Sequence, residues 1–410
     1  MARAVLLLGA ESETAEHLVL AAEALDVGVH VAVHRGLYRT YAGALRRRLA
    51  DVVFSDFRTP MDALDQLSEH CAREGIGGVA AGGVFLSPLA ASLADRLGLP
   101  GNTPGPAPAG RDKWLMAQAF RERGVPHPRT LAITAFDDAV PSVGAAGLDY
   151  PVIVKPAESS ASVGVSLVDS PDHLAGAIRV AQRRRELRYG APLDGTVLVQ
   201  QYLRGIACSV VTVAHRGTYE HLAILRKYTA GGRGREGTGH TVPADIDPRS
   251  EGPVLAAVER GLAALGLNDG VAQSDLVLTA AGPKLITVDV GPPDVPTMQV
   301  IEHASGVDVA AVYLQTVLGE RPDTGPRRTG AAAIRFITTV RHGVFRGLDG
   351  LAGSPHVALV RSYVEPGELI GNAHAQFTRL GHVIVQAPSP AQADLRADEA
   401  IACISSRVEP

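Results

Sequence analysis

The chain has 410 residues, of which 46% are hydrophobic and 20% charged, which suits two or three globular domains and excludes a disordered chain. Lys and Arg number 39 against 43 Asp and Glu, for a formal net charge of −4, and 4% of residues are aromatic, so a nucleic-acid-binding coat is not expected. Three widely spaced cysteines predict neither a disulfide framework nor a metal site. That cysteine pattern favours a reducing cytoplasm, and the first apolar run is too short for a signal peptide or a membrane span, so we expect neither a secreted nor a membrane-embedded protein.

The first hundred residues alternate short apolar strands with helices. Strands are expected at 5–8, 27–33, 52–54 and 78–80, and helices at 11–25, 61–73 and 86–96. This alternation is typical of a doubly wound parallel sheet. Only Gly9 follows the first strand, so the dinucleotide-binding fingerprint is absent. The Pro- and Gly-rich segment 99–106 predicts a boundary, and we assign residues 1–110 to an N-terminal α/β domain.

The remainder of the chain is expected to be α+β. A helix at 112–123 precedes strands at 130–132 and 152–154, and Ser170 followed by Pro171 predicts the start of a helix that runs to about Arg188. Later strands are expected at 331–337, 357–363 and 382–386, before a last helix at 390–405. We therefore divide this part into 111–326, with a subdomain at about 124–195, and a C-terminal unit at 327–410.

Two patterns suggest chemistry that their context does not support. Gly232, Gly234 and Gly237 match G-x-G-x-x-G, but the residues that follow cannot open the long helix that a dinucleotide site needs. The pattern favours a glycine-rich loop instead. The fourteen histidines form no spacing suited to zinc. His30 and His34 alternate with valines, and we interpret both as structural.

Two acids on a predicted hairpin suggest a metal site. Strand-like runs flank a turn at 280–283, and pairing centred on Gly282 places Asp275 directly opposite Asp289. Opposed side chains lie about 5 Å apart, where two unit charges repel by about 3 kcal/mol at an effective dielectric constant of about 20. A divalent cation or a shared proton removes this repulsion, and an all-oxygen ligand set favours Mg²⁺ or Mn²⁺ as the cation. A register one residue off, or two solvated acids, remains the alternative.

A buried strand at 152–154 ends in Lys155 and is followed by a loop rich in Ser and Gly. The backbone N–H groups and hydroxyls of such a loop can bind phosphate, and Lys155 adds a positive charge. The P-loop pattern is absent, so an ordinary Ser-rich hairpin remains the alternative.

Taken in order, these segments resemble the ATP-grasp superfamily and, within it, the carboxylate–amine ligases, especially L-amino-acid ligases that form dipeptides. The resemblance rests on Gly98–Asn102 with Arg111–Lys113, Tyr150–Pro156 with Ser159–Gly164, Val197–Gly205, Asp275 with Asp289, Ala331–Phe336 and Tyr363–Gly367. It implies an α/β and α+β multidomain fold. An ATP-grasp domain would lie between an N-terminal Rossmann-like parallel sheet and a C-terminal α+β unit that completes the acceptor site.

The resemblance also implies roles for individual residues. ATP would be bound by two phosphate lysines, a lid loop and an adenine-binding hinge, which comprise Lys113, Lys155, Ser159, Ser160, Ser162, Gly164, Gln200, Gln201, Tyr202 and Leu203. The carbonyl of Gln201 and the N–H of Leu203 would contact the base. Asp275 and Asp289 would hold Mg²⁺ or Mn²⁺, Lys227 would contact the γ-phosphate, and His240 would orient substrate or phosphate.

Several positions depart from the family pattern. Ala207 stands where the family has an acid that holds the ribose. Gly291 stands in place of the amide ligand and Pro293 in place of the arginine. Arg335 is a candidate to replace the missing arginine, with a structural role for a strand arginine near a domain border as the alternative. We expect an ATP-dependent ligase that joins a small carboxylate to an amine, with natural-product biosynthesis and a homodimer as further implications. A degenerate ATP-grasp protein that binds without ligating, or a ligase with a non-amine nucleophile, remains the alternative.

Overall fold

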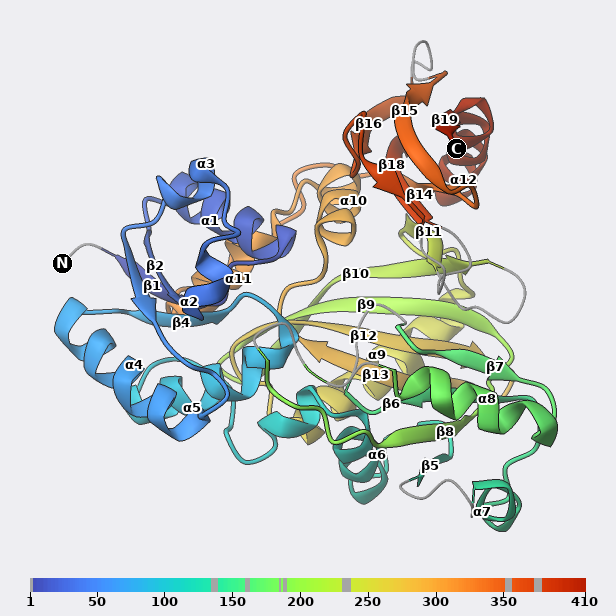
Figure 1. The fold of residues 1–410 in the computed structure, drawn as a ribbon, viewed down its shortest axis with the longest axis horizontal. Coiled ribbons are helices and arrows are strands. Elements are labelled where there is room, and N and C mark those ends of the chain that lie inside the picture. Colours follow the sequence, from blue (N-terminus) through green and yellow to red (C-terminus); the bar gives the residue numbers. More distant parts are fainter. Residues whose placement is uncertain are drawn as a thin grey trace.

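The computed structural model describes residues 3–133, 139–158, 163–183, 186, 190–230, 237–350, 356–371 and 378–410. An N-terminal unit, a large central sheet with a smaller sheet beside it, and a C-terminal unit make up the molecule (Figure 1). Ser159, Ser160 and Ser162 lie outside the described residues, as does the segment 231–236 with Gly232 and Gly234.

The N-terminal unit is a parallel four-stranded sheet, as predicted. Its strands are β1 (Ala4–Leu8), β2 (Gly28–Val33), β3 (Asp51–Phe54) and β4 (Gly78–Ala81), in the order β3-β2-β1-β4. Its helices are α1 (Glu13–Ala24), α2 (Arg35–Tyr38), α3 (Gly43–Arg46), α4 (Pro60–Glu74) and α5 (Ser87–Leu97). Because β1 is flanked on both sides, alternate side chains enter two cores: Leu6 and Leu8 pack with α4 and α5, and Val5 and Leu7 pack with α1.

Two helices from much later in the chain complete this unit. They are α10 (Val295–Ser305) and α11 (Val309–Val317), and α11 packs against α1 and β4. The approach is close at Gly78, where an added Cβ would lie 2.5 Å from the carbonyl oxygen of Val317. Only glycine fits there without displacing the backbone.

A small antiparallel sheet follows the N-terminal unit. It contains β5 (Thr130–Ile133), β6 (Val152–Pro156), β7 (Ser166–Val168) and β8 (Val197–Gln201), in the order β5-β8-β6-β7. It is preceded by α6 (Lys113–Glu122) and packs against α7 (Ala139–Ala145) and α8 (Pro171–Ala181). The prediction that α8 continues to about Arg188 is wrong, because the helix ends at Ala181, which is its last buried residue.

The large sheet has eight strands in the order β13-β12-β9-β10-β11-β14-β18-β16. Their bounds are β9 (Ile206–His215), β10 (Thr218–Thr229), β11 (Gly237–Val242), β12 (Gly270–Thr279), β13 (Gly282–Val290), β14 (Ala331–Thr339), β16 (Val357–Ser362) and β18 (Thr378–Ala387). One face packs against α9 (Pro248–Ala264) and, at the other end, α12 (Pro390–Cys403). The C-terminal strands therefore extend the central sheet, and a three-stranded sheet of β15 (Gly343–Asp349), β17 (Leu369–Ile370) and β19 (Ser405–Glu409) lies beside them.

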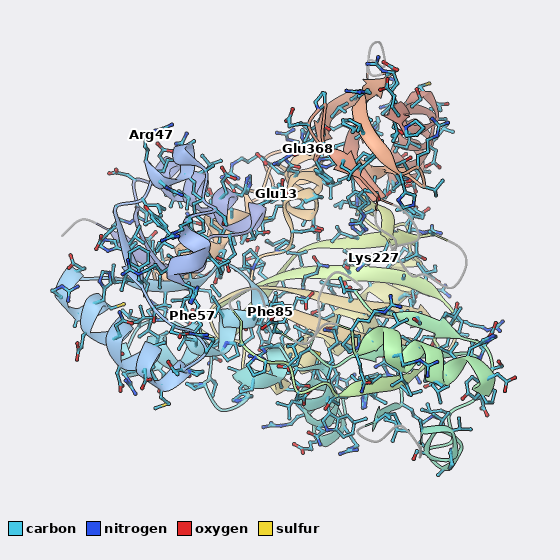
Figure 2. The ribbon with its side chains drawn as sticks, in the orientation of Figure 1. Glu13, Arg47, Phe57, Phe85, Lys227 and Glu368 are labelled. Atoms are coloured by element: carbon cyan, nitrogen blue, oxygen red, sulfur yellow. The ribbon has the colours of Figure 1, made fainter. Side chains whose placement is uncertain are left out.

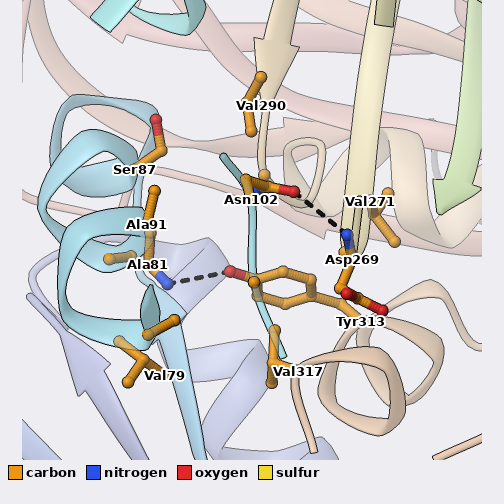
Figure 3. Close-up of a pocket in the computed structure, with 15 residues that line it drawn as sticks. Val79, Ala81, Ser87, Ala91, Asn102, Asp269, Val271, Val290, Tyr313 and Val317 are labelled. Carbon is orange, nitrogen blue, oxygen red and sulfur yellow. Dashed lines mark hydrogen bonds between the residues drawn. The ribbon is translucent and has the colours of Figure 1, made fainter. Parts of the chain in front are cut away.

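Contacts between units hold this arrangement together. Glu13, labelled in Figure 2 at the start of α1, forms an ion pair of 2.7 Å with Arg361 of β16. A small cavity of about 20 Å³ lies where β4, α5, the linker and α11 meet, and there the hydroxyl of Tyr313 accepts a 2.9 Å hydrogen bond from the N–H of Ala81 (Figure 3). That volume suits about one water molecule, so this cavity is not a candidate substrate site.

Within the described ranges, no helix combines the length and apolarity needed to cross a membrane. Cys71, Cys208 and Cys403 are all free thiols.

Candidate active site

The candidate site lies on the face of the large sheet opposite α9, between that sheet and the small sheet. On the large sheet, Asp275 of β12 pairs with Ser209 of β9, and Lys227 of β10 pairs with His240 of β11. Lys227, labelled in Figure 2, marks this face. From the small-sheet side, Lys113 and Lys155 lie within electrostatic range of Asp275 and Asp289.

The β12–β13 hairpin exists, but its predicted register is wrong. Thr279 pairs with Gly282 across the two-residue turn Ala280-Ala281, so the turn is not centred on Gly282. Asp275 consequently pairs with Thr287, and Asp289 pairs with Gln273. The acids are diagonal neighbours rather than directly opposed.

A β-bulge nevertheless brings the two acids to one face of the sheet. Near the turn, Leu276 pairs with Leu285. If this register ran on unbroken, Asp275 would pair with Ile286, and Asp289 would point to the opposite face of the sheet from Asp275. The register shifts by one residue between Asp275 and Leu276, which restores the common face. The bulge is therefore the local feature that makes a two-carboxylate site geometrically available.

Asp275 is surrounded by donors. Lys227 Nζ lies 2.6 Å from its Oδ2, and its Oδ1 accepts hydrogen bonds from the Ser209 hydroxyl and, at 3.2 Å, from Gln273 Nε2. Burial acts to raise the pKa of Asp275, but the Lys227 ammonium and these hydrogen bonds outweigh it and hold the pKa below its usual value. Asp275 is therefore ionised, and its carboxylate is held in place by these donors.

Asp289 has a different environment. Among the described residues no hydrogen bond to its carboxylate is found, and burial, aided by the nearby Asp275, raises its pKa against the opposing effect of Lys113. The Thr287 hydroxyl, on the same face, is buried and likewise has no hydrogen-bond partner in the described part of the chain. An oxygen-rich position with a carboxylate that lacks donors fits a hard divalent cation, so the residues present suit Mg²⁺ or Mn²⁺.

Lys113 is positioned by the start of α6. The Asp112 side chain accepts hydrogen bonds from the N–H groups of Trp114 and Leu115, which fixes the first turn. The Lys113 N–H donates to the Ala157 carbonyl at 3.1 Å and ties this turn to the end of β6. Burial lowers the pKa of the Lys113 ammonium, although Asp289 acts in the opposite direction. An anion beside Lys113 would offset that cost of burial.

Lys155 is buried at the end of β6 and donates a 2.9 Å hydrogen bond to Gln200 Oε1. Gln200 Nε2 in turn donates to the Thr130 hydroxyl at 2.9 Å. Burial, followed by repulsion from Lys113, lowers the pKa of Lys155 to about 7. The side-chain amide of Gln200, which was predicted to contact the nucleotide, thus binds Lys155 and Thr130 in this structure.

The predicted hinge follows β8. The Gln201 backbone pairs with Val152 and its N–H donates to the Arg129 carbonyl at 2.8 Å, while Tyr202 and Leu203 begin the connection to β9. Gly164, the described end of the predicted lid, has φ of +76°, and an added Cβ would lie 3.0 Å from the Pro156 ring. Its backbone therefore requires glycine.

His240 lies on the site face beside Lys227. Its ring is buried and meets the ring of Phe336 edge-on at 6.0 Å, and its Nδ1 has no hydrogen-bond partner among the described residues. Burial, followed by the charge of Lys227, lowers the pKa of His240 to about 4. A neutral imidazole with an unused nitrogen can bind a polar substrate group.

Arg335 does not join this group. It pairs with Gly239, one position from His240, so its side chain extends from the opposite face of the sheet. There Nε and Nη2 bind Asp398 and Asp394 of α12, each at 2.7 Å. The prediction that Arg335 supplies charge to the reacting groups is therefore wrong, because two carboxylates on the far face hold its guanidinium.

Sequence reasoning missed three residues that shape the site: Ser209, Gln273 and Thr287. Ser209 and Gln273 bind Asp275, and Thr287 lies between the two acids on the hairpin. The alternation of polar residues at 273, 275, 287 and 289 was a usable signal for one polar face, but Ser209 depends on which strand lies beside β12.

Comparison with known proteins agrees with this geometry. Residues 110–292 match the ATP-grasp domain family, and residues 335–409 match the family of L-amino acid ligase C-terminal domain 2. Residues 110–292 therefore form an ATP-grasp domain, and residues 335–409 are similar to a C-terminal domain of L-amino acid ligases. With these two matches in this order, the chain resembles the L-amino acid ligases, a group of carboxylate–amine ligases.

Individual relatives are distant. An uncharacterised protein of Sinorhizobium fredii, y4rH, is 26% identical over 75% of this chain and 64% of its own length. A D-alanine–D-alanine ligase of Halorhodospira halophila is 30% identical over 43% of this chain and 55% of its own length. The matches thus span less than two thirds of these relatives. The crystal structure of an L-amino acid ligase from Bacillus licheniformis aligns with a TM-score of 0.81 at 18% identity, covering 100% of this chain and 99% of that one. This likeness shows a common fold.

Proposed function

We propose that the protein is an ATP- and Mg²⁺-dependent ligase that joins a carboxylate to an amine. The substrate carboxylate would attack the γ-phosphorus of ATP, giving an acyl phosphate and ADP, and the amine would then displace phosphate to form an amide. The observation that carries this proposal is the convergence of Lys113 and Lys155 with Asp275 and Asp289 inside an ATP-grasp domain. Two lysines, whose pKa values burial lowers, and two acids suit a magnesium-bound polyphosphate.

The residues of this chain would act mainly by positioning and by charge neutralisation. Asp275 and Asp289 would hold Mg²⁺, which neutralises phosphate charge when bound. Lys113 and Lys155 would bind phosphate oxygens, an interaction that favours their charged forms. Lys227 already fixes the Asp275 carboxylate at 2.6 Å, and its ammonium faces the same space. Lys227 would therefore orient the metal-binding acid and contact the transferring phosphoryl group.

His240 would lie on the substrate side of this group. Its pKa of about 4 keeps the imidazole neutral near pH 7, so it would hydrogen-bond a substrate without adding positive charge. The backbone of Gln201 and Leu203 would bind adenine. The described Gly164, together with Ser159, Ser160 and Ser162, would form the lid that excludes water from the acyl phosphate.

The finer parts of the proposal rest on the family comparison. The match of residues 335–409 to an L-amino acid ligase domain supports amino acids or related small metabolites as substrates, with a role in natural-product biosynthesis. The three free cysteines support a cytoplasmic location. A homodimer is proposed by analogy with related ligases.

The test is a mixed amino-acid reaction with ATP and Mg²⁺, followed by ADP release and by mass spectrometry of the products. We expect ADP release that depends on a particular acid and amine, with a product lighter by one water than their sum. Asp289→Asn should abolish both signals. The matched control Asp349→Asn removes an exposed acid that pairs with Arg407, and should retain them.

Nucleotide binding without turnover over a broad panel of acids and amines would contradict the ligase and favour the degenerate binding protein. ADP release that gives an ester or thioester product would contradict the amine as nucleophile.

A further inference from the structure

A second cluster of ligand-type side chains lies in the N-terminal unit, outside the site described above. His30 of β2 pairs with Asp51, the first residue of β3, and His70 comes from α4, which covers this side of the sheet. His30 Nδ1 and His70 Nε2 lie 3.2 Å apart. His30, Asp51 and His70 each offer a ligand atom, and these three atoms all lie within 4.8 Å of one another. Within the described ranges, no other group of three or more His, Cys, Asp or Glu residues meets this criterion.

No spacing in the sequence indicated this group, because about 20 residues separate each member from the next, and His30 was interpreted as structural. His34 fits that interpretation, since its Nδ1 accepts a 3.3 Å hydrogen bond from the Gly36 N–H at the start of α2. His30 differs because the fold brings His70 and Asp51 to it.

We propose that His30, His70 and Asp51 form a binding site for a divalent transition-metal ion such as Zn²⁺. Zinc–imidazole bonds of about 2.0–2.1 Å at a tetrahedral angle place two nitrogens about 3.4 Å apart. The observed 3.2 Å is close to that separation. Two imidazoles with one carboxylate suit zinc, cobalt or nickel better than magnesium, so the chemistry differs from that of the Asp275–Asp289 site.

The site can be reached from solvent. His30 lines a surface cleft of about 410 Å³ together with Arg3, Gly28 and Glu74. Asp51 is exposed, His30 is half-buried and His70 is buried, so two of the three ligands have access to solvent. An ion held there would join β2, β3 and α4, and would leave a coordination position for water.

The charges around His70 make a specific prediction. Asp51 and Glu74 favour a cation, whereas Arg73 opposes one, and Arg73 Nη2 lies 3.1 Å from His70 Nδ1. When Arg73 donates to Nδ1, the proton of His70 is on Nε2 and points at His30, which gives a hydrogen-bonded pair. Metal binding requires a lone pair on Nε2, and so requires Arg73 to turn away. Arg73 already binds Glu74 at 2.9 Å and its side chain is 64% exposed, so it is able to move.

The experiment titrates the full-length, chelator-treated protein with Co²⁺ and follows its visible absorption, with Zn²⁺ as competitor and excess Mg²⁺ present. The Asp289→Asn variant serves as background so that the other metal site does not contribute. We expect one equivalent of Co²⁺ to bind and Zn²⁺ to displace it. His30→Asn and His70→Asn should each weaken binding about tenfold or more. Arg73→Ala should tighten it several-fold.

His34→Asn is the matched control and should bind Co²⁺ as the background protein does. If His70→Asn fails to fold, the exposed Arg73 and half-buried His30 variants still decide the question. Absence of stoichiometric Co²⁺ binding, binding that His30→Asn leaves unchanged, or weaker binding by Arg73→Ala would each overturn the proposal and leave a hydrogen-bonded histidine pair.

Discussion

The buried Lys155 predicts that nucleotide binding takes up a proton. Its pKa of about 7 means that the free protein holds this lysine largely neutral at pH 8. Phosphate oxygens stabilise the charged form, so binding should return the proton. At pH 8 the neutral fraction is about 0.9, so about 0.9 proton should be taken up per nucleotide, and the affinity should fall about tenfold between pH 6 and pH 8.

The perturbation that tests this is Gln200→Glu. Lys155 is held by a neutral amide at 2.9 Å, and a carboxylate there would raise the lysine pKa through direct ion pairing. The free variant would already be protonated at pH 8, so proton uptake should largely disappear. The assay is calorimetric binding of a non-hydrolysable ATP analogue, with Mg²⁺ in excess, in buffers of different ionisation enthalpy.

Gln201→Glu is the matched control, because its side chain lies near Arg129 and Lys284 rather than Lys155. It adds the same charge one residue away and should keep the proton uptake of the unmodified protein. Equal proton uptake by the unmodified protein and Gln200→Glu, or no uptake by either at pH 8, would refute the reasoning.

Three further predictions concern stability and positioning. Lys155→Met should raise the free energy of unfolding, most strongly below pH 7, because the folded protein there keeps a buried lysine charged. Between pH 7 and 10.5 the unfolded chain binds a proton that the folded protein does not, so the unmodified protein becomes more stable as pH rises. Denaturant titrations over this pH range should therefore show the stability difference between the two proteins shrinking. Asp394→Asn removes an ion pair with the buried Arg335 and should lower the free energy of unfolding by about 1–3 kcal/mol in chemical denaturation. Asp398→Asn removes the more exposed ion pair and should lower it by less. Gly78→Ala forces a Cβ against the Val317 carbonyl and should cost about 1–3 kcal/mol, and an unchanged melting temperature would contradict the close packing of α11.

The N-terminal sheet could be predicted because its strands are short apolar runs bounded by clear helix signals. In Val5 to Leu8 every residue is buried, as a strand covered on both faces requires. The end of α8 was harder to predict, since the arginine-rich segment after Ala181, which also contains Glu186 and Leu187, retains helical propensity. Helices α9 to α11 were not predicted, although Asp247 and Asp294 are N-caps with a proline at the first or second helical position after them.

The candidate site was predictable only in part, for a physical reason. Residue types identified Asp275 and Asp289, but their register depends on a bulge that leaves no clear sequence signal. Arg335 failed as a candidate because neighbouring strands decide which face a side chain occupies. The partners of Lys155 and Asp275 come from strands distant in sequence, and tertiary pairing alone brings them together.

The central claim is that Asp275 and Asp289 jointly hold the metal that accompanies the nucleotide. Paramagnetic resonance of Mn²⁺ titrated with a non-hydrolysable ATP analogue tests it most directly. We predict a tight Mn²⁺ site that appears only with the nucleotide and is lost in both Asp275→Asn and Asp289→Asn, while His30→Asn retains it. Unchanged nucleotide-dependent Mn²⁺ affinity in either aspartate variant would contradict the account.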